Sequence, residues 1–171
     1  MSAGQLSLHV PEPPVRPGGS PDFGFLRIPE AGKVRRPPVD TDPESIYDIA
    51  QSLVRVLDED GNAVGEWAGN TDTDTLRAGL RAMLKTRAYD QRMTMMQRQG
   101  QTSFYMQCLG EEAVACAFQA ALEKGDMNFP TYRQQGLLIA SGYPLVDMMC
   151  QIYSNSRDPM KGRQLPVMYS S

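Results

Sequence analysis

Residues 71–100, TDTDTLRAGLRAMLKTRAYDQRMTMMQRQG, decide the fold of the chain because they predict one long helix. Apolar side chains recur in this stretch at helical spacing, at Leu76, Leu80, Met83 and Leu84. A Thr or Asp among residues 73–75 can cap the start of the helix, and Gly100 is a natural end. The methionines that follow are typical of an adaptable core or interface, namely Met93, Met95 and Met96.

Three shorter helices are predicted after the long one. The first lies in GEEAVACAFQAALEKGD, residues 110–126, where Glu111 and Glu112 oppose the positive end of the helix dipole. The second is RQQGLLIASG, residues 133–142, and the third is YPLVDMMCQIYSN, residues 143–155. The expected buried face of the third helix consists of Leu145, Met148, Met149 and Ile152.

The chain before the long helix has a different character. Residues 53–67, LVRVLDEDGNAVGEW, predict a β-hairpin, because alternating valines flank the turn sequence DEDGN. Nine of the 13 prolines fall within the first 43 residues. Residues 1–46 are therefore expected to form a Pro-rich arm, either disordered or lying along a partner subunit, and residues 47–171 the domain.

Composition excludes several classes of protein. The formal net charge of −3 and the pI near 5.2 disfavour a general nucleic-acid binder. The only histidine, His9, lies in the arm, so catalysis by histidine is not expected in the domain. The three cysteines form no CxxC pair and predict buried thiols, with no metal site. No apolar run is long enough to span a membrane, so we expect a cytoplasmic protein.

The stretch NFPTYRQQGLLIASGYP, residues 128–144, contains the candidate binding residues Tyr132 and Arg133. Pro130 disfavours helix before it, so both residues stand near a helix start, where free N–H groups attract anions. A guanidinium beside such a start suits an oxyanion or a phosphate. From these residues alone, an ordinary surface arginine remains the competing interpretation.

Three blocks of sequence resemble a known family in their order and spacing. They are GQTSFYMQCLGEEA at residues 100–113, FPTYRQQGLLIASGYPL at residues 129–145 and KGRQLPVMYS at residues 161–170. Together they resemble the alpha subunit of the branched-chain 2-oxo acid dehydrogenase, the decarboxylating component, in its bacterial form. The resemblance implies an α/β, thiamine-diphosphate-binding fold in the full subunit. This N-terminal portion is expected to be mostly helical with a small β-hairpin, and the family's metal-binding motif is expected to follow it.

The resemblance also implies an activity and its partners. Family members catalyse oxidative decarboxylation of 3-methyl-2-oxobutanoate and related acids, with acyl transfer to a lipoyl group. They use thiamine diphosphate with magnesium, which is bound where alpha and beta subunits meet in an alpha2beta2 tetramer. A lipoyl-bearing acyltransferase is the further partner. The chain alone is expected to be inactive, and the alternatives are an inactive helical interaction fragment or the alpha subunit of a related pyruvate or 2-oxo acid dehydrogenase.

Site residues follow from the same resemblance. Tyr132 and Arg133 match the family's Tyr-Arg motif, which contacts the diphosphate of thiamine diphosphate. Phe104, Tyr105 and Met106 match positions that line the substrate and cofactor cavity. Related pyruvate enzymes have a histidine in place of Met106, so the methionine favours an aliphatic branched substrate. No catalytic residue and no metal ligand is expected in this chain.

Overall fold

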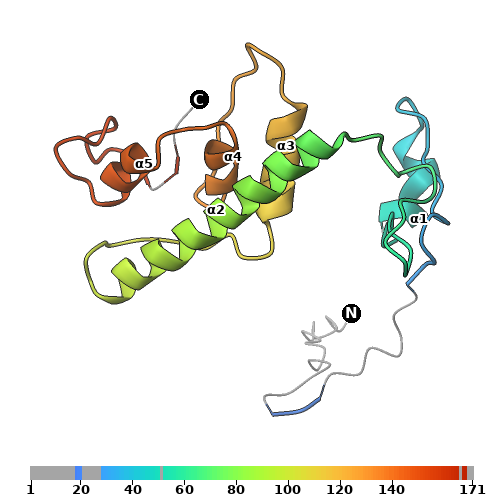
Figure 1. Ribbon diagram of the computed structural model, residues 1–171, viewed down its shortest axis with the longest axis horizontal. Helices are drawn as coiled ribbons and strands as arrows, with labels where there is room; N and C mark the ends of the chain where they lie inside the picture. Colours follow the sequence, from blue (N-terminus) through green and yellow to red (C-terminus); the bar gives the residue numbers. More distant parts are fainter. Residues whose placement is uncertain (1–17, 21–27, 51, 166, 169–171) are drawn as a thin grey trace, which may run out of the picture. The chain divides into compact units, whose positions relative to one another are not determined.

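The computed structural model describes residues 18–20, 28–50, 52–165 and 167–168. The chain forms two compact units, residues 1–70 and 71–171 (Figure 1). Residues 1–17 and 21–27 of the expected arm, with His9, lie outside the described residues. The division into an arm of residues 1–46 and a domain of residues 47–171 stays a prediction.

The second unit contains the long helix as predicted. Helix α2 runs Thr73–Arg98, and Gly100 follows it in the left-handed conformation with φ of 70°. The cap is Asp72, one residue before the expected window of residues 73–75. Its carboxylate accepts hydrogen bonds from the backbone N–H of Thr75 at 2.9 Å and from the Thr75 hydroxyl at 2.6 Å. The first bond pairs a backbone N–H that has no partner within the helix, and the second holds the Thr75 side chain in place. Both stabilise the start of the helix.

The buried face of α2 is not the face of the leucines that revealed the helix. Leu76, Leu80 and Leu84 are each more than half exposed. The buried residues are Ala82, Thr86, Tyr89, Asp90, Met93 and Met96. A Cβ at Gly136 would lie 3.1 Å from the Cβ of Ala115 and 3.6 Å from the Cγ2 of Thr86. Small residues therefore let three helices approach closely on this side, whereas leucines would hold them apart.

Three further helices complete the second unit: α3 (Glu112–Ala121), α4 (Gln135–Ala140) and α5 (Leu145–Ile152). Helices α2, α3 and α4 contact one another, and α4 and α3 lie across α2 in Figure 1. The core cluster consists of Tyr89, Met93, Met96, Tyr105, Leu138, Ile139, Met148, Ile152 and Val167. Met148 and Ile152 confirm half of the expected buried face of α5, whereas Leu145 is exposed. The mostly helical expectation is confirmed.

The cysteines are buried and free, as predicted for Cys108, Cys116 and Cys150. Burial raises the pKa of the Cys108 thiol, and the nearby carboxylate of Asp90 raises this pKa further. Burial also raises the pKa of the Cys116 thiol. Both thiols are therefore held in the unreactive protonated form.

The first unit contains a 3₁₀ helix, η1 (Pro43–Ile46), and a short helix, α1 (Tyr47–Ala50). The hairpin predicted for residues 53–67 is wrong, because the described residues contain no strand there. What forms is a turn with one isolated antiparallel bridge between Leu57 and Ala63. An isolated two-stranded hairpin is only marginally stable in water. The antiparallel pairing does not continue past Gly65, because the backbone of Gly65 has a φ of 82° and leaves the extended conformation.

Gly65 turns away to pack against a second glycine. A Cβ at Gly65 would lie only 2.3 Å from the Cα of Gly32. The N–H of Gly32 donates to the carbonyl of Arg55 at 2.9 Å, so the turn is bound to residues before η1 instead of to a second strand. The close contact between Gly32 and Gly65 thus decides the conformation of residues 53–67.

A Gly65→Ala substitution is expected to open this turn. The added methyl overlaps Gly32, and φ of 82° disfavours any residue with a Cβ. Gly61→Ala is the matched control, because Gly61 has φ of 81° but open space around it. Gly61→Ala should destabilise the turn by about 1 kcal/mol and Gly65→Ala by more than about 2 kcal/mol. Hydrogen exchange of the Val64 amide, which donates to Val56, measures both. Equal protection factors in the two variants would contradict the close glycine packing.

Candidate functional site

The two segments predicted to form the site, residues 104–106 and residues 132–133, lie together in the second unit. The Phe104 ring packs edge-on against the Tyr132 ring, with centroids 5.8 Å apart and an interplanar angle of 85°. Such an edge-to-face pair is a favourable aromatic geometry. Residues 28 positions apart in sequence therefore meet at the start of α4, where both rings remain partly accessible.

Arg133 lies beside this aromatic pair and is half exposed. Its guanidinium carbon is 5.8 Å from the Tyr132 ring centroid, and its Nη1 is 3.6 Å from Oε1 of Glu111. The Nε of Arg133 is buried and has no hydrogen-bond partner. A buried donor without a partner is costly, so this guanidinium has unused capacity for an oxygen acceptor.

A pocket of about 390 Å³ opens next to Arg133. Its walls come from α3, from the loop of residues 127–130 and from the start of α4, and they include Val114, Phe118 and Phe129. The pocket therefore combines apolar walls with the paired charges of Arg133 and Glu111. A ligand with an apolar body and an anionic end suits it where that end takes the place of the Glu111 carboxylate beside Arg133.

Tyr105 and Met106 are placed differently from Phe104. Tyr105 is buried in the core, and its hydroxyl donates to Oδ1 of Asp90 at 2.5 Å. Burial, followed by the hydrogen bond to Asp90, raises the pKa of Tyr105, so the hydroxyl stays neutral. Met106 is partly exposed, and its carbonyl accepts a hydrogen bond from Nε2 of Gln135 at 3.1 Å. The side chain of Tyr105 thus supports the segment from the interior, and Met106 lies nearer the surface.

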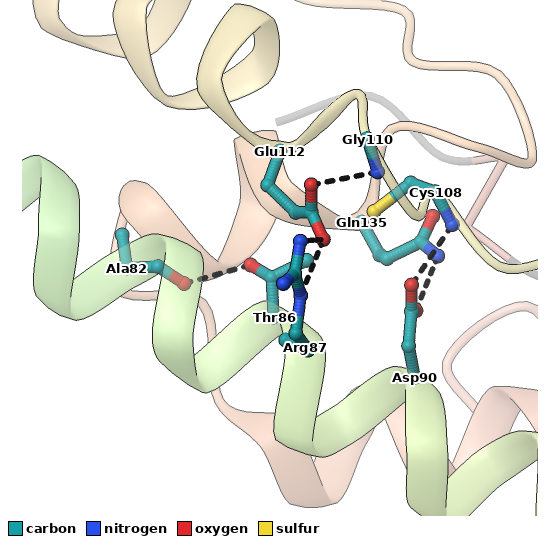
Figure 2. A network of polar contacts seen from close by, with 8 residues as sticks. All are labelled: Ala82, Thr86, Arg87, Asp90, Cys108, Gly110, Glu112 and Gln135. Atoms are coloured by element: carbon teal, nitrogen blue, oxygen red, sulfur yellow. Dashed lines mark hydrogen bonds and ion pairs between the residues drawn. The ribbon is translucent and has the colours of Figure 1, made fainter.

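Sequence reasoning missed Asp90. Figure 2 shows this carboxylate on α2 facing Gln135 of α4 and the backbone of Cys108. Its Oδ1 accepts from Nε2 of Gln135 at 2.6 Å, and its Oδ2 accepts from the N–H of Cys108 at 2.8 Å. The sequence carried no signal for this, because the leucine spacing marked another face of α2 and the burial of Thr86, four residues before Asp90, is known only from the structure.

Glu111 and Glu112 were predicted to be helix-start residues, and they have different environments. Glu111 makes no side-chain cap and lies near Arg133. Glu112 is buried, and its Oε1 accepts from Nε and Nη2 of Arg87 at 3.0 and 2.8 Å (Figure 2). Its Oε2 accepts from the N–H of Gly110 at 2.9 Å. Glu112 therefore links α3 to α2.

The Glu112 carboxyl makes stability depend on pH in a defined direction. Burial raises its pKa, but hydrogen bonds from its own N–H, Arg87 and Gly110 outweigh burial and hold the pKa below the ordinary 4.5. A lowered folded pKa contributes stability above the unfolded value, and this contribution is lost as pH falls through the folded value. Glu112→Gln should therefore reduce the loss of thermal midpoint between about pH 5 and pH 3. Identical pH profiles in the variant and the wild type would exclude this role.

Candidate metal sites and membrane-spanning helices are both absent from the part of the chain that the structure describes. No group of three or more His, Cys, Asp or Glu side chains in it could hold a metal ion. Among the helices of the same residues, none is both long enough and apolar enough to cross a bilayer.

Comparison with known proteins gives two family matches. The profile described as Dehydrogenase E1 component matches residues 80–171. The profile described as 2-oxoisovalerate dehydrogenase E1 alpha subunit N terminal matches residues 4–44. The first match spans just over half of the chain and includes the whole candidate site.

Similar curated proteins come from bacteria, plants and animals. The 2-oxoisovalerate dehydrogenase subunit alpha of Pseudomonas aeruginosa is 61% identical over 166 residues, which cover 97% of this chain and 40% of that protein. The mitochondrial subunit alpha 1 of Arabidopsis thaliana is 37% identical, covering 68% of this chain and 25% of the relative. The mitochondrial subunit alpha of Mus musculus is 36% identical, covering 68% of this chain and 27% of that protein. The chain thus spans between a quarter and two fifths of the length of these relatives.

Proposed function

Because the chain belongs to the dehydrogenase E1 component family, we propose that it is the N-terminal part of a branched-chain 2-oxo acid dehydrogenase alpha subunit. The proposed reaction is oxidative decarboxylation of 3-methyl-2-oxobutanoate and related acids, with acyl transfer to a lipoyl group. The main support is 61% identity over 97% of the chain to a bacterial 2-oxoisovalerate dehydrogenase alpha subunit. The family is thiamine-diphosphate-dependent.

The residues at the start of α4 fit the diphosphate end of this cofactor. Arg133 has a buried Nε without a partner, and phosphate oxygens are the acceptors that a planar guanidinium binds in pairs. Its present contact with Glu111 joins two half-exposed groups at 3.6 Å. Exposed pairs of this kind contribute little free energy, so a phosphate can replace Glu111.

In this proposal Arg133 binds diphosphate oxygens and the Tyr132 hydroxyl adds a donor. The segment of Phe104, Tyr105 and Met106 borders the substrate side of the cofactor site in this proposal, with Phe104 and Met106 partly exposed and Tyr105 buried behind them. Phe104 orients Tyr132 through ring contact, and Tyr105 supports the segment from the core. When bound, thiamine diphosphate supplies the carbon nucleophile and electron sink for loss of CO2, while the protein orients the reactants and excludes water.

The remaining parts of the proposal follow from the resemblance. They are an α/β sheet in the full subunit, magnesium accompanying the diphosphate, a beta subunit in an alpha2beta2 assembly, a lipoyl-bearing acyltransferase and a cytoplasmic location. None of them rests on a contact within the described residues.

The test compares two substrates in the full-length subunit assembled with its beta partner. We expect kcat/KM for 3-methyl-2-oxobutanoate to exceed that for pyruvate by at least about tenfold, because pocket fit to aliphatic groups gives discrimination of roughly this size. A preference for pyruvate would favour the related pyruvate dehydrogenase instead. Absence of decarboxylation of any 2-oxo acid by the assembled enzyme would favour a purely structural role.

A further inference from the structure

The carboxylate of Asp90 connects the two segments of the candidate site beneath its surface. Asp90 is only 3% exposed, and its two oxygens accept three hydrogen bonds. Two donors, the Tyr105 hydroxyl and the Cys108 N–H, belong to the segment around Phe104. The third donor, the Gln135 amide, belongs to α4, as Figure 2 shows. The bonds from one helix therefore determine how these two segments lie relative to each other.

The hydrogen bonds of Gln135 also restrict the backbone position of Arg133, which lies two residues before it. The Gln135 side chain is completely buried, and its Nε2 also donates to the carbonyl of Met106 at 3.1 Å. The adjacent Gly136 packs so closely that a Cβ there would be 3.1 Å from Ala115. The first turn of α4 can therefore neither slide nor rotate without breaking buried hydrogen bonds or overlapping α3.

We propose that Asp90 and Gln135 are positioning residues for the diphosphate-binding pair Tyr132 and Arg133. This inference rests on the proposed function. Neither residue touches the ligand; each acts by fixing the backbone from which the guanidinium extends. Only a carboxylate accepts on both oxygens, so an amide at position 90 would direct an NH₂ group either at the Cys108 N–H or at both the Tyr105 and Gln135 donors.

The experiment uses two matched glutamine substitutions in the full-length subunit assembled with its beta partner. Gln151 on α5 is also buried, accepts from the N–H of Val167 at 2.8 Å and donates to the carbonyl of Leu165 at 3.2 Å. Gln135→Leu and Gln151→Leu each remove a buried amide, which makes three hydrogen bonds in Gln135 and two in Gln151. We expect both variants to lower the thermal midpoint. Only Gln135→Leu should weaken thiamine diphosphate binding, by roughly tenfold in calorimetry, since small displacements of a binding group have effects of this order.

Asp90→Asn provides a second variant that keeps the shape of the side chain, and it is expected to weaken cofactor binding in the same direction. If Gln135→Leu does not assemble with the beta partner, the cofactor affinity of Asp90→Asn decides the test. Wild-type cofactor affinity in the assembled variant, or equal weakening in Gln151→Leu, overturns the positioning role. Unchanged affinity in Arg133→Ala would instead overturn the proposed diphosphate site, so the two failures are distinguishable.

Discussion

Replacing Arg133 with alanine is expected to weaken thiamine diphosphate binding by roughly tenfold to a hundredfold in the assembled full-length enzyme, because a charge-assisted hydrogen bond contributes about 1.5–3 kcal/mol. The Arg133 side chain is half exposed, and its buried Nε has no hydrogen-bond partner. Truncation should leave the fold intact, since the side chain is half exposed. Calorimetric titration of the cofactor in the presence of magnesium measures the change.

Two further variants separate charge from geometry at this position. Arg133→Lys keeps the positive charge but loses the planar pair of donors, so its cofactor affinity should lie between those of wild type and Arg133→Ala. Glu111→Gln removes the carboxylate 3.6 Å from Nη1 and should not weaken binding. An unchanged dissociation constant in Arg133→Ala would show that the diphosphate lies elsewhere.

Leu138→Ala should destabilise the helical unit by about 2–5 kcal/mol. Leu138 is completely buried in the core cluster, where a truncated side chain leaves a cavity among tightly packed neighbours. Equilibrium unfolding of the chain in denaturant, followed by circular dichroism, gives the difference in free energy of unfolding. The substitution should shift the midpoint with little change in slope.

Leu80→Ala is the matched control, because it makes the same chemical change on α2, where Leu80 is more than half exposed. Its effect in the same chain should stay within about 0.5 kcal/mol. A loss at Leu80 as large as that at Leu138 would mean that α2 buries its leucine face, contrary to the packing seen here.

The candidate site was only partly predictable from sequence. Tyr132 and Arg133 were identified by the resemblance, because on local pattern alone an ordinary surface arginine was the favoured interpretation. The contact between Phe104 and Tyr132 joins residues far apart in sequence, so no local rule could predict it. Asp90 was missed because acidic residues on helices are usually exposed, and its three donors come from other parts of the chain.

The leucines of α2 and the hairpin that did not form also separate what local sequence predicts from what tertiary contacts decide. Spacing in residues 71–100 correctly predicted a helix, since periodicity depends only on local geometry. Which face became buried depended on close packing against α3 and α4, where Gly136 lies beside both Ala115 of α3 and Thr86 of α2. The sequence DEDGN within residues 53–67 correctly located a turn, whereas the alternation around it wrongly predicted strands, because Gly65 packs closely on Gly32 where the second strand was expected.

By itself, the sequence determined the helices, the burial of the cysteines and the family, because helix periodicity, apolar character and ordered motifs are properties of the chain read in order. Only the tertiary structure decided which side of α2 faces the core, what Glu112 and Asp90 bind, and where Arg133 lies relative to Phe104. Those outcomes depend on close packing and on hydrogen bonds between distant segments. Such contacts exist only once the chain has folded.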